Sequence, residues 1–125
     1  MGLTEQEEGG GQGTDREPSS ETLEVLSDSR SRSILVEMRR QKDTLTAKEI
    51  SENCEIPLST VYRKLDALLG AGLIKELMEL RKGCTHTHTY ELRFEDIEVS
   101  VTEEGMKAEI TRPREREKTV GQRFS

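Results

Sequence analysis

The chain has 125 residues, a net charge of −6 and only 3% aromatic residues. This length suits one compact domain, whose core must be built mainly from Leu, Ile and Val. Two cysteines exclude a disulfide scaffold, no apolar run approaches the roughly 20 residues that span a bilayer, and the N-terminus does not resemble a signal peptide. We therefore expect a cytoplasmic protein that makes no membrane contact.

The charge is unevenly distributed along the chain. Residues 1–27 carry seven acids and one base, and residues 94–125 carry eight acids and six bases, whereas residues 28–93 carry twelve bases and ten acids. Overall acidity argues against a nucleic-acid ligand, because DNA binding relies on Lys and Arg at phosphates. Local charge decides binding, however, so the middle block keeps DNA open as a partner.

Residues 1–18 contain Gly, Glu, Gln and Thr with little to bury, and we expect them to be disordered. Ser19 and Ser20 are N-cap residues for a short first helix. Asp28 can cap a second helix, whose apolar stripe comprises Ile34, Leu35 and Met38. Both helices belong to a domain predicted over residues 19–112, followed by a charged, flexible tail at 113–125.

Two further short helices follow a polar break. Thr46 and Glu49 form a capping box, in which each side chain satisfies the backbone N–H of the other, and this begins a third helix. Glu55 lies in the turn after it. A fourth helix opens at residue 57 or 58, because Pro is tolerated in a first turn, and ends at the glycines near residue 70.

The apolar period then changes from 3.6 to 2, which predicts antiparallel strands. One strand runs from 73 to 81, a second alternates through Tyr90, Leu92 and Phe94, and two more surround a turn at 103–105. In the last pair we expect one buried and one exposed face. The apolar positions of this last pair are Ile97, Val99, Val101, Met106, Ala108 and Ile110. The fold class is therefore α+β: a winged helix-turn-helix of three to four short helices, a β-hairpin wing and a second hairpin.

Two short helices joined by a tight turn form a helix-turn-helix, whose second helix fits the major groove. The apolar stripe of the fourth helix predicts that Ser59, Thr60, Tyr62, Arg63 and Asp66 point outward. The wing at about 73–94 would then lie on the DNA backbone. The predicted DNA-contacting residues are Ser59, Thr60, Tyr62, Arg63, Lys64, Arg81, Lys82, Thr85 and His86. We expect double-stranded DNA as the partner, bound by a homodimer because two-fold pairing doubles the contacted surface.

These segments resemble a known group of regulators. The stretch from Leu26 to Leu35 is similar to the opening helices of ArsR-like regulators, and residues 47–65 resemble the helix-turn-helix of archaeal winged-helix repressors. Gly72-Leu73-Ile74 is similar to the helix-to-wing junction of that group. The resemblance implies a DNA-binding transcriptional regulator whose fourth helix contacts DNA and whose wing tip touches phosphate. The group usually has Gly where this chain has Glu55, and its dimerising C-terminal helix has no counterpart in this polar tail.

Two alternatives concern function. Cys84, His86 and His88 alternate along one strand, so they could converge on a metal ion in a metal-responsive repressor, although neighbours two apart on a strand lie nearly 7 Å apart. The wing interpretation of the same residues needs no metal, and we expect no cofactor. A winged helix can also be a protein-interaction module of the transcription machinery, which the net acidity favours. An enzyme is not expected, because the sequence has no catalytic motif.

Overall fold

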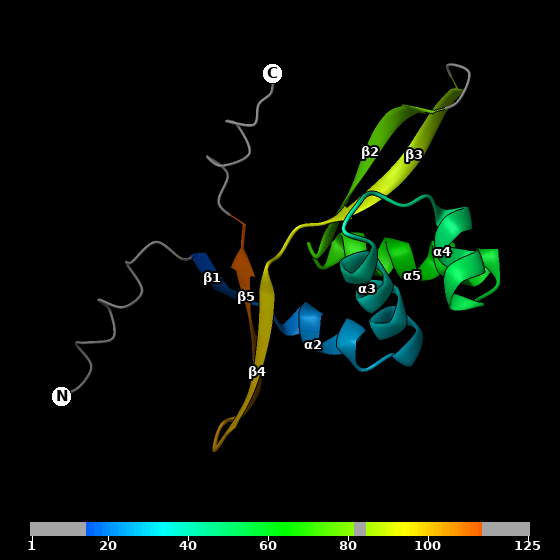
Figure 1. The fold of residues 1–125 in the computed structure, drawn as a ribbon. Helices are drawn as coiled ribbons and strands as arrows, with labels where there is room; N and C mark the ends of the chain where they lie inside the picture. Colours follow the sequence, from blue (N-terminus) through cyan, green and yellow to red (C-terminus); the bar gives the residue numbers. More distant parts are fainter. Residues whose placement is uncertain (1–14, 82–84, 114–125) are drawn as a thin grey trace. The chain divides into compact units, whose positions relative to one another are not determined.

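A computed structural model describes residues 15–81 and 85–113 (Figure 1). The chain divides into two compact units, one formed by residues 19–93 and the other by residues 1–18 together with 94–125. The domain expected over 19–112 therefore includes residues of both units, and the last hairpin pairs with an N-terminal strand. In the described part of the chain, no helix is long and apolar enough to cross a membrane.

The first two helices of the 19–93 unit begin at the expected capping residues. Helix α2 (Ser20–Leu26) begins after Ser19, whose hydroxyl accepts from the Thr22 N–H at 3.1 Å. Helix α3 (Ser29–Gln41) begins after Asp28, whose carboxylate accepts from the Ser31 N–H at 2.8 Å. Each cap satisfies an N–H that has no partner inside its helix. The C-cap residue of α3 is Lys42, a non-glycine residue in the left-handed region.

Helices α4 (Ala47–Cys54) and α5 (Leu58–Gly70) follow. The capping box of α4 is present in both directions, because the Thr46 N–H donates to Glu49 at 2.9 Å and the Glu49 N–H donates to Thr46 at 3.0 Å. A glycine with a φ of 76°, Gly72, separates α5 from the next strand. The predicted capping box of α4 is confirmed, and α5 begins and ends where the sequence predicted.

A hairpin of two antiparallel strands completes this unit: β2 (Ile74–Arg81) and β3 (Thr85–Leu92). Strand β3 thus ends before Phe94, which was expected to continue it. Leu45 pairs with Tyr90 on the other side of β3 through two backbone hydrogen bonds of 2.8 and 3.2 Å. This pairing attaches the chain between α3 and α4 to the base of the hairpin.

Aliphatic side chains fill the interior of the 19–93 unit, as the composition predicted. The fully buried ones include Ile34, Ile50, Val61, Leu65, Leu68, Leu73 and Ile74. Glu37 is a buried carboxylate of α3, and it accepts hydrogen bonds from Arg40, Gln41 and Asn53. Because Asn53 belongs to α4, this contact joins α3 to α4. Cys54, at the end of α4, is half-buried.

The second unit is a three-stranded antiparallel sheet with the order β1-β5-β4, made of β1 (Asp15–Pro18), β4 (Asp96–Thr102) and β5 (Gly105–Arg112). The expectation of disorder up to residue 18 is wrong for Asp15–Pro18, because these residues pair with β5. Residues 1–14 and most of the tail expected to be flexible, 114–125, lie outside the described residues. Gly105, with a φ of 130°, closes the turn between β4 and β5 as predicted.

Only part of the face that we expected to be buried in β4 and β5 is buried. Ala108 and Ile110 of β5 are buried, but Val99, Val101 and Met106 are 46%, 78% and 58% exposed. The alternation therefore predicted correctly which residues share a face. The burial that we expected for these three residues is wrong. Their apolar surface is left open to solvent in the single chain.

Candidate nucleic-acid interface

The turn between α4 and α5 is closed by short backbone and side-chain contacts. The Ile56 N–H donates to the Ser51 carbonyl at 3.1 Å, and the Ser51 hydroxyl donates to the Ile56 carbonyl at 2.6 Å. Glu55 adopts φ 58° and ψ 47°, the left-handed conformation that glycine adopts without strain. A non-glycine residue in this conformation is strained, so Glu55 carries a cost of roughly 1 kcal/mol.

Helix α5 presents one exposed strip opposite its buried stripe. Ser59, Tyr62, Arg63 and Asp66 recur at i, i+3, i+4 and i+7 and are all exposed, with half of Tyr62 accessible. This strip carries hydroxyl, phenol and guanidinium groups, which can hydrogen-bond to base edges and phosphates. The outward orientation predicted for these four residues is confirmed.

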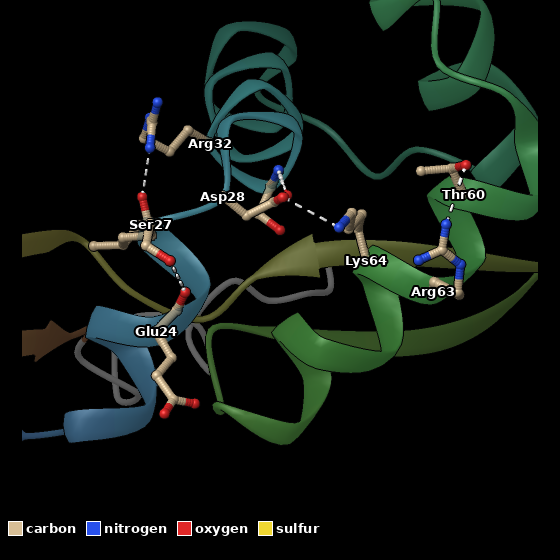
Figure 2. Close-up of polar contacts among 9 residues, drawn as sticks. Glu24, Ser27, Asp28, Arg32, Thr60, Arg63 and Lys64 are labelled. Atoms are coloured by element: carbon tan, nitrogen blue, oxygen red, sulfur yellow. Dashed lines mark hydrogen bonds and ion pairs between the residues drawn. The ribbon is translucent and has the colours of Figure 1, made fainter.

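Two of the predicted contact residues of α5, Thr60 and Lys64, do not lie on this exposed strip. Thr60 is 7% exposed, so its expected outward orientation is wrong, and Arg63 donates weakly to its hydroxyl at 3.5 Å (Figure 2). Thr60 lies beside Val61 on the buried side of α5. The buried face of this helix is therefore wider than its aliphatic residues alone indicate. Lys64 is directed to the N-terminus of α3, where its ammonium lies 3.2 Å from Asp28 Oδ1 (Figure 2).

The register of the wing places six side chains on one of its faces. Glu76 faces Tyr90, Met78 faces His88 and Leu80 faces His86 across the strands. Met78 and Leu80 are 55% and 63% exposed. Arg81 and Thr85 pair at the end of the strands, but their side chains, like the whole of Lys82 and Cys84, lie outside the described residues.

A cleft of about 490 Å³ lies between the start of α4, helix α5 and this face of the wing. Its walls are formed by Thr46, Ala47, Lys48, Tyr62, Glu76, His86, Thr87, His88 and Tyr90. Within it, His88 Nδ1 lies 2.6 Å from Glu76 Oε2, and the Tyr90 hydroxyl donates to the same oxygen at 3.5 Å. The pKa of Tyr90 is raised to about 12, first by burial and then by the charge of Glu76.

The cleft adds residues that the sequence alone did not single out. Lys48 follows Thr46 and Ala47 at the start of α4, and it is an exposed cation that lines the cleft together with Tyr62. The capping box could have indicated this position, because it marks where the helix begins. Glu76 had no signal in the sequence: only the pairing of β2 with β3 brings its carboxylate to His88 and Tyr90.

Cys84, His86 and His88 remain an untested metal hypothesis. His86 and His88 share the exposed face of β3, but Cys84 lies outside the described residues. Within residues 15–81 and 85–113, no group of three His, Cys, Asp or Glu side chains is arranged to hold a metal ion.

Comparison with known families gives one match. Residues 22–76 match the model of a family described as a helix-turn-helix domain. The match extends from α2 through the turn and α5 into the start of β2, and it points to DNA binding as the class of function. No curated protein and no solved structure is significantly similar to the chain.

Proposed function

We propose that this protein is a transcriptional regulator that binds specific double-stranded DNA sequences as a homodimer. The observation that carries the proposal is the exposed strip of Ser59, Tyr62 and Arg63 on the second helix of a helix-turn-helix. In this proposal, helix α5 enters the major groove, where Arg63 can donate two hydrogen bonds to a guanine edge. The protein is not an enzyme in this proposal, and it would act as a regulator similar to the ArsR-like group that its sequence resembles.

The wing supplies affinity that does not depend on sequence. Arg81 is the last residue of β2 and Lys82 is the next residue in the sequence, and a cation close to phosphate needs no fixed register. Thr85 and His86 follow in β3 and extend the same backbone contact. Lys48 at the start of α4 is a further candidate for contact with a DNA phosphate, since it lies in the cleft between α5 and the wing.

Binding can be tested by fluorescence anisotropy on a duplex selected from a random pool and on a scrambled duplex, across several salt concentrations. Arg63→Ala should cost roughly 1–3 kcal/mol on the selected site and relax preference at one base pair. The double variant Arg81→Ala, Lys82→Ala should weaken both duplexes alike and flatten the salt dependence. Lys107→Ala removes an exposed cation from β5 and serves as the matched control.

A second function has one observation in its favour. The wing face exposes Met78 and Leu80 beside the carboxylate of Glu76. This surface is more apolar and more acidic than the protein surfaces that usually contact the DNA backbone. Such a face suits a protein partner of the transcription machinery. If neither the wild type nor any variant binds duplex DNA at low salt, this protein-interaction function replaces the regulator.

A further inference from the structure

Strand β4 is an open edge of the second unit. Among the described residues, β4 is hydrogen-bonded to β5 on one side only, and the sheet ends there. Proteins usually protect such edges with lysine, proline, bulges or short strands. Strand β4 runs for seven residues, Asp96–Thr102, without lysine or proline, whereas the opposite edge, β1, has four residues and ends in Pro18.

The same strand carries an exposed apolar stripe. Val99 and Val101 lie on the face that also holds Met106 of β5, since Val101 pairs with Met106 and Val99 with Ala108. Val101 is 78% exposed, the highest value among the large apolar side chains of the described chain. An apolar stripe beside an unpaired edge indicates that another strand covers both.

We propose that β4 pairs with β4 of a second copy, antiparallel about a two-fold axis at Val99, to form one continuous six-stranded sheet. Val99 is the midpoint of Asp96–Thr102, so this pairing uses the whole strand. It places Ile97 opposite Val101 of the partner subunit, which extends the apolar stripe across the axis. The inference specifies the homodimer of the proposed function, and it can be tested without DNA.

The charges of β4 select this register. Centred on Val99, each acid faces a hydroxyl: Asp96 faces a threonine and Glu98 faces a serine, both of which can donate to a carboxylate. Moving the axis to Glu98 puts two glutamates directly opposite each other. Moving it to Ser100 puts Asp96 opposite Glu104 and Ile97 opposite Glu103, and like charges facing each other destabilise a sheet. A shift by one residue of register would set apolar side chains against polar ones.

Disulfide trapping tests the register in the full chain, with Cys54→Ser and Cys84→Ser as the background. Val99→Cys places two thiols opposite each other, with Cα atoms roughly 4.5–5.5 Å apart, which a disulfide spans. Val101→Cys is the matched control, because the two thiols would lie roughly 13 Å apart along the strands. We expect a covalent dimer from Val99→Cys and none from Val101→Cys. Equal cross-linking of both, or none from Val99→Cys, would overturn the register.

Light scattering on a size-exclusion column tests the interface itself. Val99→Glu should raise the dimer dissociation constant at least tenfold, whereas Val36→Glu, the same change at a similarly exposed valine of α3, should leave it unchanged. Ser100→Lys puts a cation opposite Glu98 of each copy, so it should lower that constant by roughly two- to thirtyfold. Circular dichroism checks that each variant folds. A wild type that stays monomeric at tens of micromolar but still binds duplex DNA would sink this interface and leave the proposed DNA binding intact.

Discussion

The carboxylate of Asp28 serves two helices at once: one oxygen caps α3 through the Ser31 N–H at 2.8 Å, and the other lies 3.2 Å from the ammonium of Lys64 on α5 (Figure 2). Helix α5 carries the exposed strip proposed to read DNA. The contact therefore connects the start of α3 to the middle of the proposed recognition helix, and it restrains how α5 lies against α3.

Removing the Asp28 side chain should destabilise the protein by about 1 kcal/mol through the lost cap. The contact with Lys64 should add only roughly 0.2–1 kcal/mol, because both side chains are partly exposed to solvent. Urea unfolding of Asp28→Ala, Lys64→Ala and the double variant measures both contributions in one cycle. Asp28→Asn is the control that keeps a capping oxygen but not the charge. A coupling of zero would show that Lys64 rests beside Asp28 without stabilising it.

Acid should remove part of this stabilisation. The pKa of Asp28 is lowered from its ordinary value of 3.8, first by the hydrogen bond from Ser31 and further by Lys64, while partial burial opposes the shift. A lowered pKa stabilises the folded state above the ordinary value, and this contribution disappears as pH falls through the folded-state pKa. The unfolding free energies of the wild type and Asp28→Asn should therefore converge below pH 3.8. A difference that stays constant down to pH 2 would contradict this account.

Alkali should act through Tyr90. Its pKa of about 12 lies above the ordinary value of 10.0, so the unfolded chain ionises first, and stability falls as pH rises from 10 toward 12. The chain has two tyrosines, so Tyr62→Phe leaves Tyr90 as the single phenol whose ionisation is followed by ultraviolet absorbance. We expect a midpoint near pH 12 in the folded variant, and Tyr90→Phe should lose less stability than the wild type in this range. A midpoint near pH 10 in a folded sample would refute the buried, Glu76-facing phenol.

Glu76 should weaken DNA binding in the wild type. Its carboxylate lies in the cleft between α5 and the wing, on the surface proposed to approach phosphates. Glu76→Gln should raise affinity for selected and scrambled duplexes alike, by roughly two- to fivefold at low salt, with the gain fading as salt screens the charge. Glu104→Gln, at the turn of the other hairpin, removes the same charge and serves as the control. Equal gains from both variants would mean that only net charge matters.

Local structure could be predicted from the sequence wherever neighbouring residues decide it. The caps at Ser19, Asp28 and Thr46, the start of α5 and the Gly105 turn were all predicted correctly, because each depends on contacts within a few residues. The exposed positions of α5 followed from its period in the same way. Thr60 was the exception, because the width of a buried stripe depends on how closely neighbouring helices pack.

Long-range relationships were decided by the tertiary structure alone. The pairing of β1 with β5 joins residues that are about ninety positions apart, and no local pattern distinguishes Asp15–Pro18 from the residues before it. The meeting of Glu76 with His88 and Tyr90 depends on the register of β2 against β3, and the contact of Asp28 with Lys64 depends on the packing of α3 with α5. Alternation along β4 determined which residues share a face, but burial of that face depends on what covers it, and a strand at the edge of its sheet leaves Val99 and Val101 exposed in a single chain.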